Sequence, residues 1–137
     1  MRAVTCHQNT LEVTELDTPT PAKGQLLVEV QRCGICGSDL HARVHGDELG
    51  KVMVETGYDD FMRSDQTVVL GRALYGVVAD HGPGTGKKLP IGTPVVSLPL
   101  LRNPGSVDTL GLSAKAPGAY ADYLLTQANL TLEVPNG

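Results

Sequence analysis

The chain has 137 residues, a length that suits one domain with its own core and is too short for a catalytic barrel plus a dinucleotide-binding fold. Its formal net charge at pH 7 is −4, with no Trp and one Phe, so it offers neither a basic face for phosphate backbones nor aromatic rings for base stacking. No apolar run approaches the ~20 residues of a membrane-spanning helix. We therefore expect neither nucleic acid nor a membrane as a partner, and three cysteines without an amino-terminal apolar leader predict a reduced, cytoplasmic setting.

Short strands separated by turns follow one another along most of the chain. The first two are predicted to be joined at the polar turn Gln8 and Asn9, and the fourth is expected to bend at Gly71 and Gly76. The expected strands, in chain order, are residues 2–6, 11–16, 25–31, 67–80, 94–101, 119–126 and 130–134. Many short strands between turn clusters favour an all-β barrel over an α/β sheet.

The remaining segments are predicted to be connections and short helices. A short helix is expected to begin near Gly37, and residues 42–57 carry a weaker helical pattern that contains Gly50. His45 is assigned to a solvated loop, because no spacing ties it to the acidic residues that follow. Residues 102–118 are rich in Gly, Pro and Ser and predict a long loop.

The densest group of reactive side chains is residues 33–41 (CGICGSDLH). Two thiols three positions apart have the spacing of metal half-sites and also of dithiol redox motifs. On a helix starting near Gly37, the side chains of Cys36, Ser38 and His41 would lie on neighbouring surfaces, giving a soft ligand and a path for a proton leaving a metal-bound alcohol. The residues alone leave both interpretations open.

This segment resembles the catalytic-zinc signature of the zinc-dependent alcohol dehydrogenases, in the medium-chain dehydrogenase/reductase superfamily. Other segments are similar to that family in the same order along the chain, namely MRAVTCH (1–7), PAKGQLLVEV (21–30), GTPVVSL (92–98), APGAYADYLL (116–125) and LEVPNG (132–137). The resemblance implies a mainly β, GroES-like partly open barrel with one or two short helices. It makes residues 1–137 a single catalytic-type domain, with the dinucleotide-binding Rossmann domain absent.

The resemblance also implies roles for four residues. Cys36 would be a zinc ligand, Ser38 would pass on the proton of the substrate, Asp39 would support a second zinc ligand, and His41 would relay protons to solvent. The expected ligand of the site is a small alcohol or a related small molecule. NAD(P) would be used only if a separate Rossmann domain supplied its binding site.

The chain departs from the family at the second zinc ligand. The family has a Gly-His-Glu segment there, whereas this chain has Gly71-Arg72-Ala73, so both the His and the Glu are replaced. Catalytic zinc usually needs three protein ligands, and Cys36 alone is an incomplete site. Zinc is therefore implied by the family, but we expect that it is not bound.

Arg72 would bring a positive charge to the place where a divalent cation would sit. We hypothesise that it forms an ion pair with Asp39 and shifts the Cys36 thiol toward its thiolate, since cations favour ionised neighbours. The alternative is that Arg72 points to solvent. Separately, apolar surface left uncovered near the last strands predicts self-association, such as a homodimer formed through an edge strand.

Three functions remain open, and whether the chain is an enzyme is left undecided. The first is a catalytically degenerate substrate-binding or assembly module, favoured by Arg72 and Ala73. The second is the substrate and zinc half of an NAD(P)-dependent zinc alcohol dehydrogenase with a dinucleotide-binding partner domain, favoured by Ser38 and His41. The third is a thiol redox protein using the CxxC pair of Cys33 and Cys36. The chain alone is expected to be inactive as a dehydrogenase.

Overall fold

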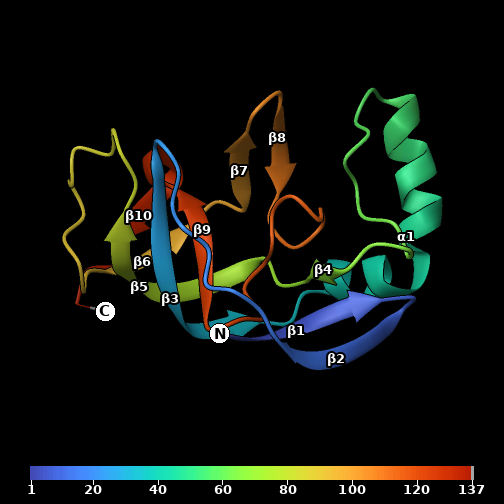
Figure 1. Ribbon diagram of the computed structural model, residues 1–137, viewed down its shortest axis with the longest axis horizontal. Helices are drawn as coiled ribbons and strands as arrows, with labels where there is room; N and C mark the ends of the chain where they lie inside the picture. Colours follow the sequence, from blue (N-terminus) through green and yellow to red (C-terminus); the bar gives the residue numbers. More distant parts are fainter. Residues whose placement is uncertain (137) are drawn as a thin grey trace.

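The computed structural model describes residues 1–136, which form three antiparallel sheets, one long α-helix and a short 3-10 turn (Figure 1). None of the helical segments in this range combines the length and the apolar character that crossing a membrane requires. The elements are β1 (Arg2–His7), β2 (Thr10–Glu15), β3 (Gln25–Gly34), α1 (Gly37–Glu55), β4 (Val68–Val69), β5 (Ala73–His81), β6 (Pro94–Ser97), β7 (Leu100–Asn103), β8 (Ser106–Thr109), β9 (Tyr123–Gln127), η1 (Ala128–Leu130) and β10 (Thr131–Glu133).

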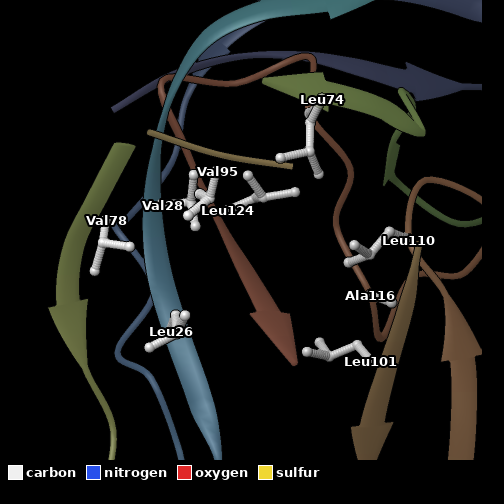
Figure 2. Packing of buried hydrophobic residues seen from close by; sticks show 10 residues of the cluster. Leu26, Val28, Leu74, Val78, Val95, Leu101, Leu110, Ala116 and Leu124 are labelled. Carbon is white, nitrogen blue, oxygen red and sulfur yellow. The ribbon is translucent and has the colours of Figure 1, made fainter. Parts of the chain in front are cut away.

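The largest sheet has five strands in the order β10-β6-β5-β3-β9. Its long strand β3, which lies between β5 and β9, alternates in sequence, so that one face can be buried. Val28 of β3 lies opposite both Val78 of β5 and Leu124 of β9. Figure 2 shows these side chains meeting in the main core, together with Leu101 and Leu110 from the β7–β8 region. The sheets are not closed into a full cylinder, and the mainly β, partly open barrel predicted from the sequence is confirmed.

A smaller sheet, ordered β2-β1-β4, lies beside helix α1. Gln8 and Asn9 join its first two strands with φ angles of 49° and 63°, the left-handed conformation that a two-residue hairpin turn requires, so this turn is confirmed. A second core forms between this sheet and α1. It contains Cys6, Ala42, Phe61, Met62, Val68, Leu70 and Leu112.

Helix α1 has 19 residues and is longer than the short helices expected. Its glycines lowered the helical signal, yet Gly46 and Gly50 are buried, and a Cβ atom at either would lie 3.7 Å from the Met62 carbonyl oxygen, an ordinary van der Waals distance. Tertiary contact therefore outweighs the weak intrinsic propensity. The backbone leaves helical geometry at His45 (φ −118°, ψ 22°), which produces a kink.

Two expected segments differ from the structure. Residues 67–80 are not one bent strand, because the chain breaks between β4 and β5 at Gly71 (φ +103°), where Ala119 and Tyr120 pack against the backbone. The predicted loop at 102–118 is wrong in its first part, since β7 and β8 form a hairpin over Leu100–Thr109. The buried Asp108 carboxylate holds this hairpin by accepting hydrogen bonds from side chains distant in sequence as well as local ones.

Apolar side chains are exposed at the last strands, as the sequence predicted. Val96 on β6 pairs with Leu132 on β10, and Leu132, on the edge strand of the large sheet, is 66% exposed. Leu98, which follows β6 in the chain, is also exposed. Whether this surface mediates self-association stays a prediction.

Candidate functional site

The CGICGSDLH segment lies where β3 passes into α1. β3 ends at Gly34, Cys36 is the N-cap of the helix, and Ser38 is in its first turn. Because β5 pairs with β3 in the register Gly34↔Ala73, Arg72 arrives directly beside the start of the helix. Sheet register thus places the Arg that replaces the expected second zinc ligand next to the cysteine that would be the first.

Three side chains form a hydrogen-bonded line at this point. Arg72 Nη1 donates to Ser38 Oγ over 3.0 Å, and Ser38 Oγ donates to Cys36 Sγ over 3.1 Å. The hydrogen bonds from the hydroxyl and the backbone N–H of Ser38 lower the pKa of the exposed Cys36 thiol, and the Arg72 charge acts in the same direction. The pKa of Cys36 is lowered in the expected direction, but Ser38, and not Arg72, is the main cause.

Asp39 does not pair with Arg72, and the hypothesised ion pair between them is wrong. Its Oδ2 accepts the Cys36 backbone N–H at 2.9 Å, as in a capping box, and the Tyr120 hydroxyl at 3.2 Å. Asp39 is therefore turned toward the helix N-terminus. Burial, followed by the charge of Asp39, raises the pKa of Tyr120 to about 12.

Two polar atoms near this line are buried without a hydrogen-bond partner, namely Asp39 Oδ1 and Arg72 Nε. Buried polar atoms in folded proteins are nearly always paired. In the family, an aspartate at this position would support a zinc-binding His at position 72. Because Arg72 replaces that His, Asp39 Oδ1 is left without a hydrogen-bond donor.

His41 lies on the exposed side of α1 and turns toward another histidine. Its ring centroid is 4.8 Å from that of His45, and His45 Nδ1 lies 3.3 Å from Glu48 Oε2. Within residues 1–136, no hydrogen bond joins His41 to Ser38. The assignment of His45 to a loop was wrong, because it lies within α1. The four-residue spacing of His41 and His45 could have indicated that their side chains are neighbours, but only if the segment was already known to be a helix.

The two thiols of the CxxC motif are not bonded to each other and lie in different environments. Cys33 is half-buried against the main core, and burial together with the Asp39 charge raises its pKa to about 11, whereas Cys36 is exposed; both are free. The chain is strand through Gly34 and extended at Cys36.

The donors at this site do not fit a zinc ion. Among residues 1–136, no group of three or more His, Cys, Asp or Glu side chains is arranged to hold a metal. Cys36 is the one thiol directed at the site, and a guanidinium lies where a second ligand would be needed. Catalytic zinc usually takes three protein ligands, and a fixed cation nearby opposes another.

Comparison with solved structures defines the class of fold. The chain superposes with a TM-score of 0.75 over 98% of its length on a crystal structure from Escherichia coli CFT073, described as the short chain alcohol dehydrogenase RspB complexed with NADH, at 23% identity. It superposes with a TM-score of 0.74 on 2R,3R-butanediol dehydrogenase from Bacillus subtilis, also at 23% identity. At this identity the likeness establishes the fold of the barrel domain of these dehydrogenases.

Sequence comparison then establishes the family. A family model described as the alcohol dehydrogenase GroES-like domain matches residues 22–136, and the chain belongs to this family. Starvation-sensing protein RspB of E. coli K12 is 28% identical over 93% of the chain, and (R,R)-butanediol dehydrogenase of B. subtilis is 25% identical over 99%. The chain spans 36% and 41% of the lengths of these two relatives. The resemblance predicted from the sequence is confirmed.

Proposed function

We propose that this chain is an alcohol dehydrogenase-like GroES domain that binds a small polar molecule, such as an alcohol, without catalytic zinc. The observation that carries the proposal is the hydrogen-bonded line from Arg72 through Ser38 to Cys36. The guanidinium supplies the positive charge at this point, and the hydroxyl that would receive the proton of a substrate is already engaged on both sides.

Binding follows from this arrangement more readily than oxidation does. The remaining guanidinium N–H groups can donate to the oxygen of an alcohol or a carbonyl compound. A guanidinium keeps its own protons at any working pH, so it cannot act as a base toward the alcohol. A metal ion activates a bound oxygen far more strongly, lowering the pKa of bound water to about 7 in favourable sites. The chain alone is therefore expected to bind without transferring hydride.

The two replaced positions supply the sharpest test. The double variant Arg72→His/Ala73→Glu returns an imidazole and a carboxylate to the site beside Cys36, and Ala73 is exposed, so the longer side chain has room. Cobalt(II) titration should give no thiolate-to-cobalt charge-transfer absorption with the unaltered chain and should give it with the double variant. Adding Cys36→Ser to the double variant should remove that absorption. Arg102→His, at an arginine of β7 outside the site, is the matched control.

One result would overturn the proposal. If the unaltered chain binds one equivalent of cobalt or zinc, and the thiolate absorption disappears in Cys36→Ser, then Arg72 does not stand in place of the metal. Counting metal alone is insufficient here, because histidines elsewhere on the surface can also hold it.

A second candidate is the substrate half of an NAD(P)-linked alcohol dehydrogenase. It is favoured by the match to about a third of a longer protein, and by the RspB structure being described as an NADH complex. Ser38 and His41 would then act in proton transfer, with the nicotinamide site and further zinc ligands supplied by other polypeptide. Reduction of NAD⁺ or NADP⁺ by a panel of small alcohols, abolished by Cys36→Ser, would support this candidate over the first.

A further inference from the structure

Helix α1 carries two histidines that the zinc-free binding function proposed above does not use. His41 and His45 are four residues apart, and their rings face each other with centroids 4.8 Å apart and planes tilted by 40°. Figure 1 shows α1 standing at one end of the molecule, away from the large sheet. Imidazoles on consecutive turns of an exposed helix can present two nitrogen ligands to one cation.

Glu48 orients one of these rings. Its Oε2 lies 3.3 Å from His45 Nδ1, one turn further along the helix. A carboxylate at Nδ1 holds the proton on that nitrogen and leaves the lone pair of Nε2 available. This carboxylate–histidine arrangement is the usual support of metal-binding histidines, because it fixes both the tautomer and the ring direction.

The neighbouring charges leave room for a cation. Arg43, which lies between the two histidines in sequence, is directed elsewhere, with its Nε donating to the Asn9 carbonyl oxygen over 2.9 Å. Asp47 is also engaged, because it accepts hydrogen bonds from the backbone and the hydroxyl of Ser64. The histidine pair thus faces solvent with a carboxylate beside it.

One chain supplies only half of a zinc coordination shell. In residues 1–136 no third His, Cys, Asp or Glu side chain joins the pair in an arrangement that could hold a metal, whereas structural zinc is almost always bound by four ligands in a tetrahedron. Two apolar side chains near His41, His45 and Glu48 are exposed: Val44 is 59% and Val52 is 55% exposed, and each lies three or four residues from one of these three residues. Such a surface suits contact with another protein.

We propose that His41 and His45 form half of a zinc site that is completed by the same two histidines of a second copy of this chain, with Glu48 orienting His45. A two-fold symmetric contact places a patch against itself, so it brings four imidazoles together without requiring any other residue. Val44 and Val52 of the two copies would surround the ion and exclude water. Imidazole ligands and a tetrahedral shell are the combination that zinc accepts.

The test is sedimentation velocity of the chain with zinc and with a chelator, paired with zinc affinity measured against a chromophoric competitor. The unaltered chain should dimerise on adding zinc, saturating at about half an equivalent per chain, as a four-imidazole site predicts. His41→Ala and His45→Ala should each abolish the zinc-dependent dimer. Glu48→Gln should weaken zinc binding by about 10- to 100-fold, the usual effect of removing such a carboxylate.

Two controls separate this site from others. His7→Ala removes an exposed histidine on β1 and should leave the response unchanged, as should Cys36→Ser, which alters the Arg72–Ser38–Cys36 line. The inference is overturned if zinc leaves the chain monomeric, if the histidine variants dimerise like the unaltered chain, or if Cys36→Ser abolishes the response. The last result would instead contradict the proposed zinc-free function.

Discussion

The buried Asp108 carboxylate gives the most direct test of what holds the β7–β8 hairpin in place. It is fully buried and accepts hydrogen bonds from Tyr58 Oη at 2.7 Å, Asn103 Nδ2 at 2.7 Å and Ser106 Oγ at 2.8 Å. Tyr58 follows α1, so this bond ties the hairpin to the segment after the helix. Tyr58→Phe removes the donor alone and leaves the ring in place.

A hydrogen bond to a charged group contributes about 1.5–3 kcal/mol, so Tyr58→Phe should lower the free energy of unfolding by roughly that amount. For a domain of this size, the loss corresponds to a fall in Tm of roughly 5–10 °C. Urea unfolding followed by circular dichroism measures it, and the m-value should not change. Tyr123→Phe on β9 is the matched control. A loss below about 0.5 kcal/mol would refute the reasoning, since one charged hydrogen bond should exceed it.

The same carboxylate predicts a pH dependence. Burial raises the pKa of Asp108, but the hydrogen bonds from Asn103, Tyr58 and Ser106 and the charge of Lys115 outweigh it, so the pKa lies below its ordinary value. A lowered folded-state pKa means that the stabilisation is complete above the unfolded-state pKa of about 4 and is lost as pH falls through the folded-state value. Tyr58→Phe should therefore flatten the acid side of the stability profile.

Three further predictions concern the site, the large sheet and its edge. Because Ser38 lowers the pKa of Cys36, alkylation of the Cys36 thiol by iodoacetamide should have a pH midpoint below the ~8.5 of a free cysteine. Ser38→Ala should move this midpoint upward, and a midpoint at or above that of a free thiol in the unaltered chain would contradict the described hydrogen bonds. Gly76→Ala should cost at least about 1–3 kcal/mol in urea unfolding, because its Cβ would collide with the backbone of β3, whereas Gly37→Ala, whose Cβ meets nothing, should cost far less. If the exposed edge strand β10 mediates self-association, Leu132→Lys should lower the sedimentation coefficient measured at high protein concentration in the presence of a chelator. If the unaltered chain is monomeric under those conditions, this edge does not self-associate.

Much of the fold could be read from local patterns. The alternation of residues 25–31, the polar turn at Gln8 and Asn9 and the ordered series of similar segments predicted the barrel, because strand period and turn chemistry are properties of neighbouring residues. The hairpin Leu100–Thr109 was missed, and one of the bonds that hold it, between Tyr58 and Asp108, joins residues fifty positions apart. Helix α1 was underestimated because its glycines fit against Met62, a contact that only the folded chain contains.

The sequence by itself determined which side chains could gather at the site: the cysteine, serine and aspartate of CGICGSDLH, and an arginine in place of the expected histidine. Only the tertiary structure decided how they pair. Asp39 is held by the helix N-terminus and by Tyr120, so the guanidinium of Arg72 reaches the hydroxyl of Ser38 and not the carboxylate. Sequence spacing limits which residue types can meet, whereas strand register and helix direction set which atoms lie within hydrogen-bonding distance.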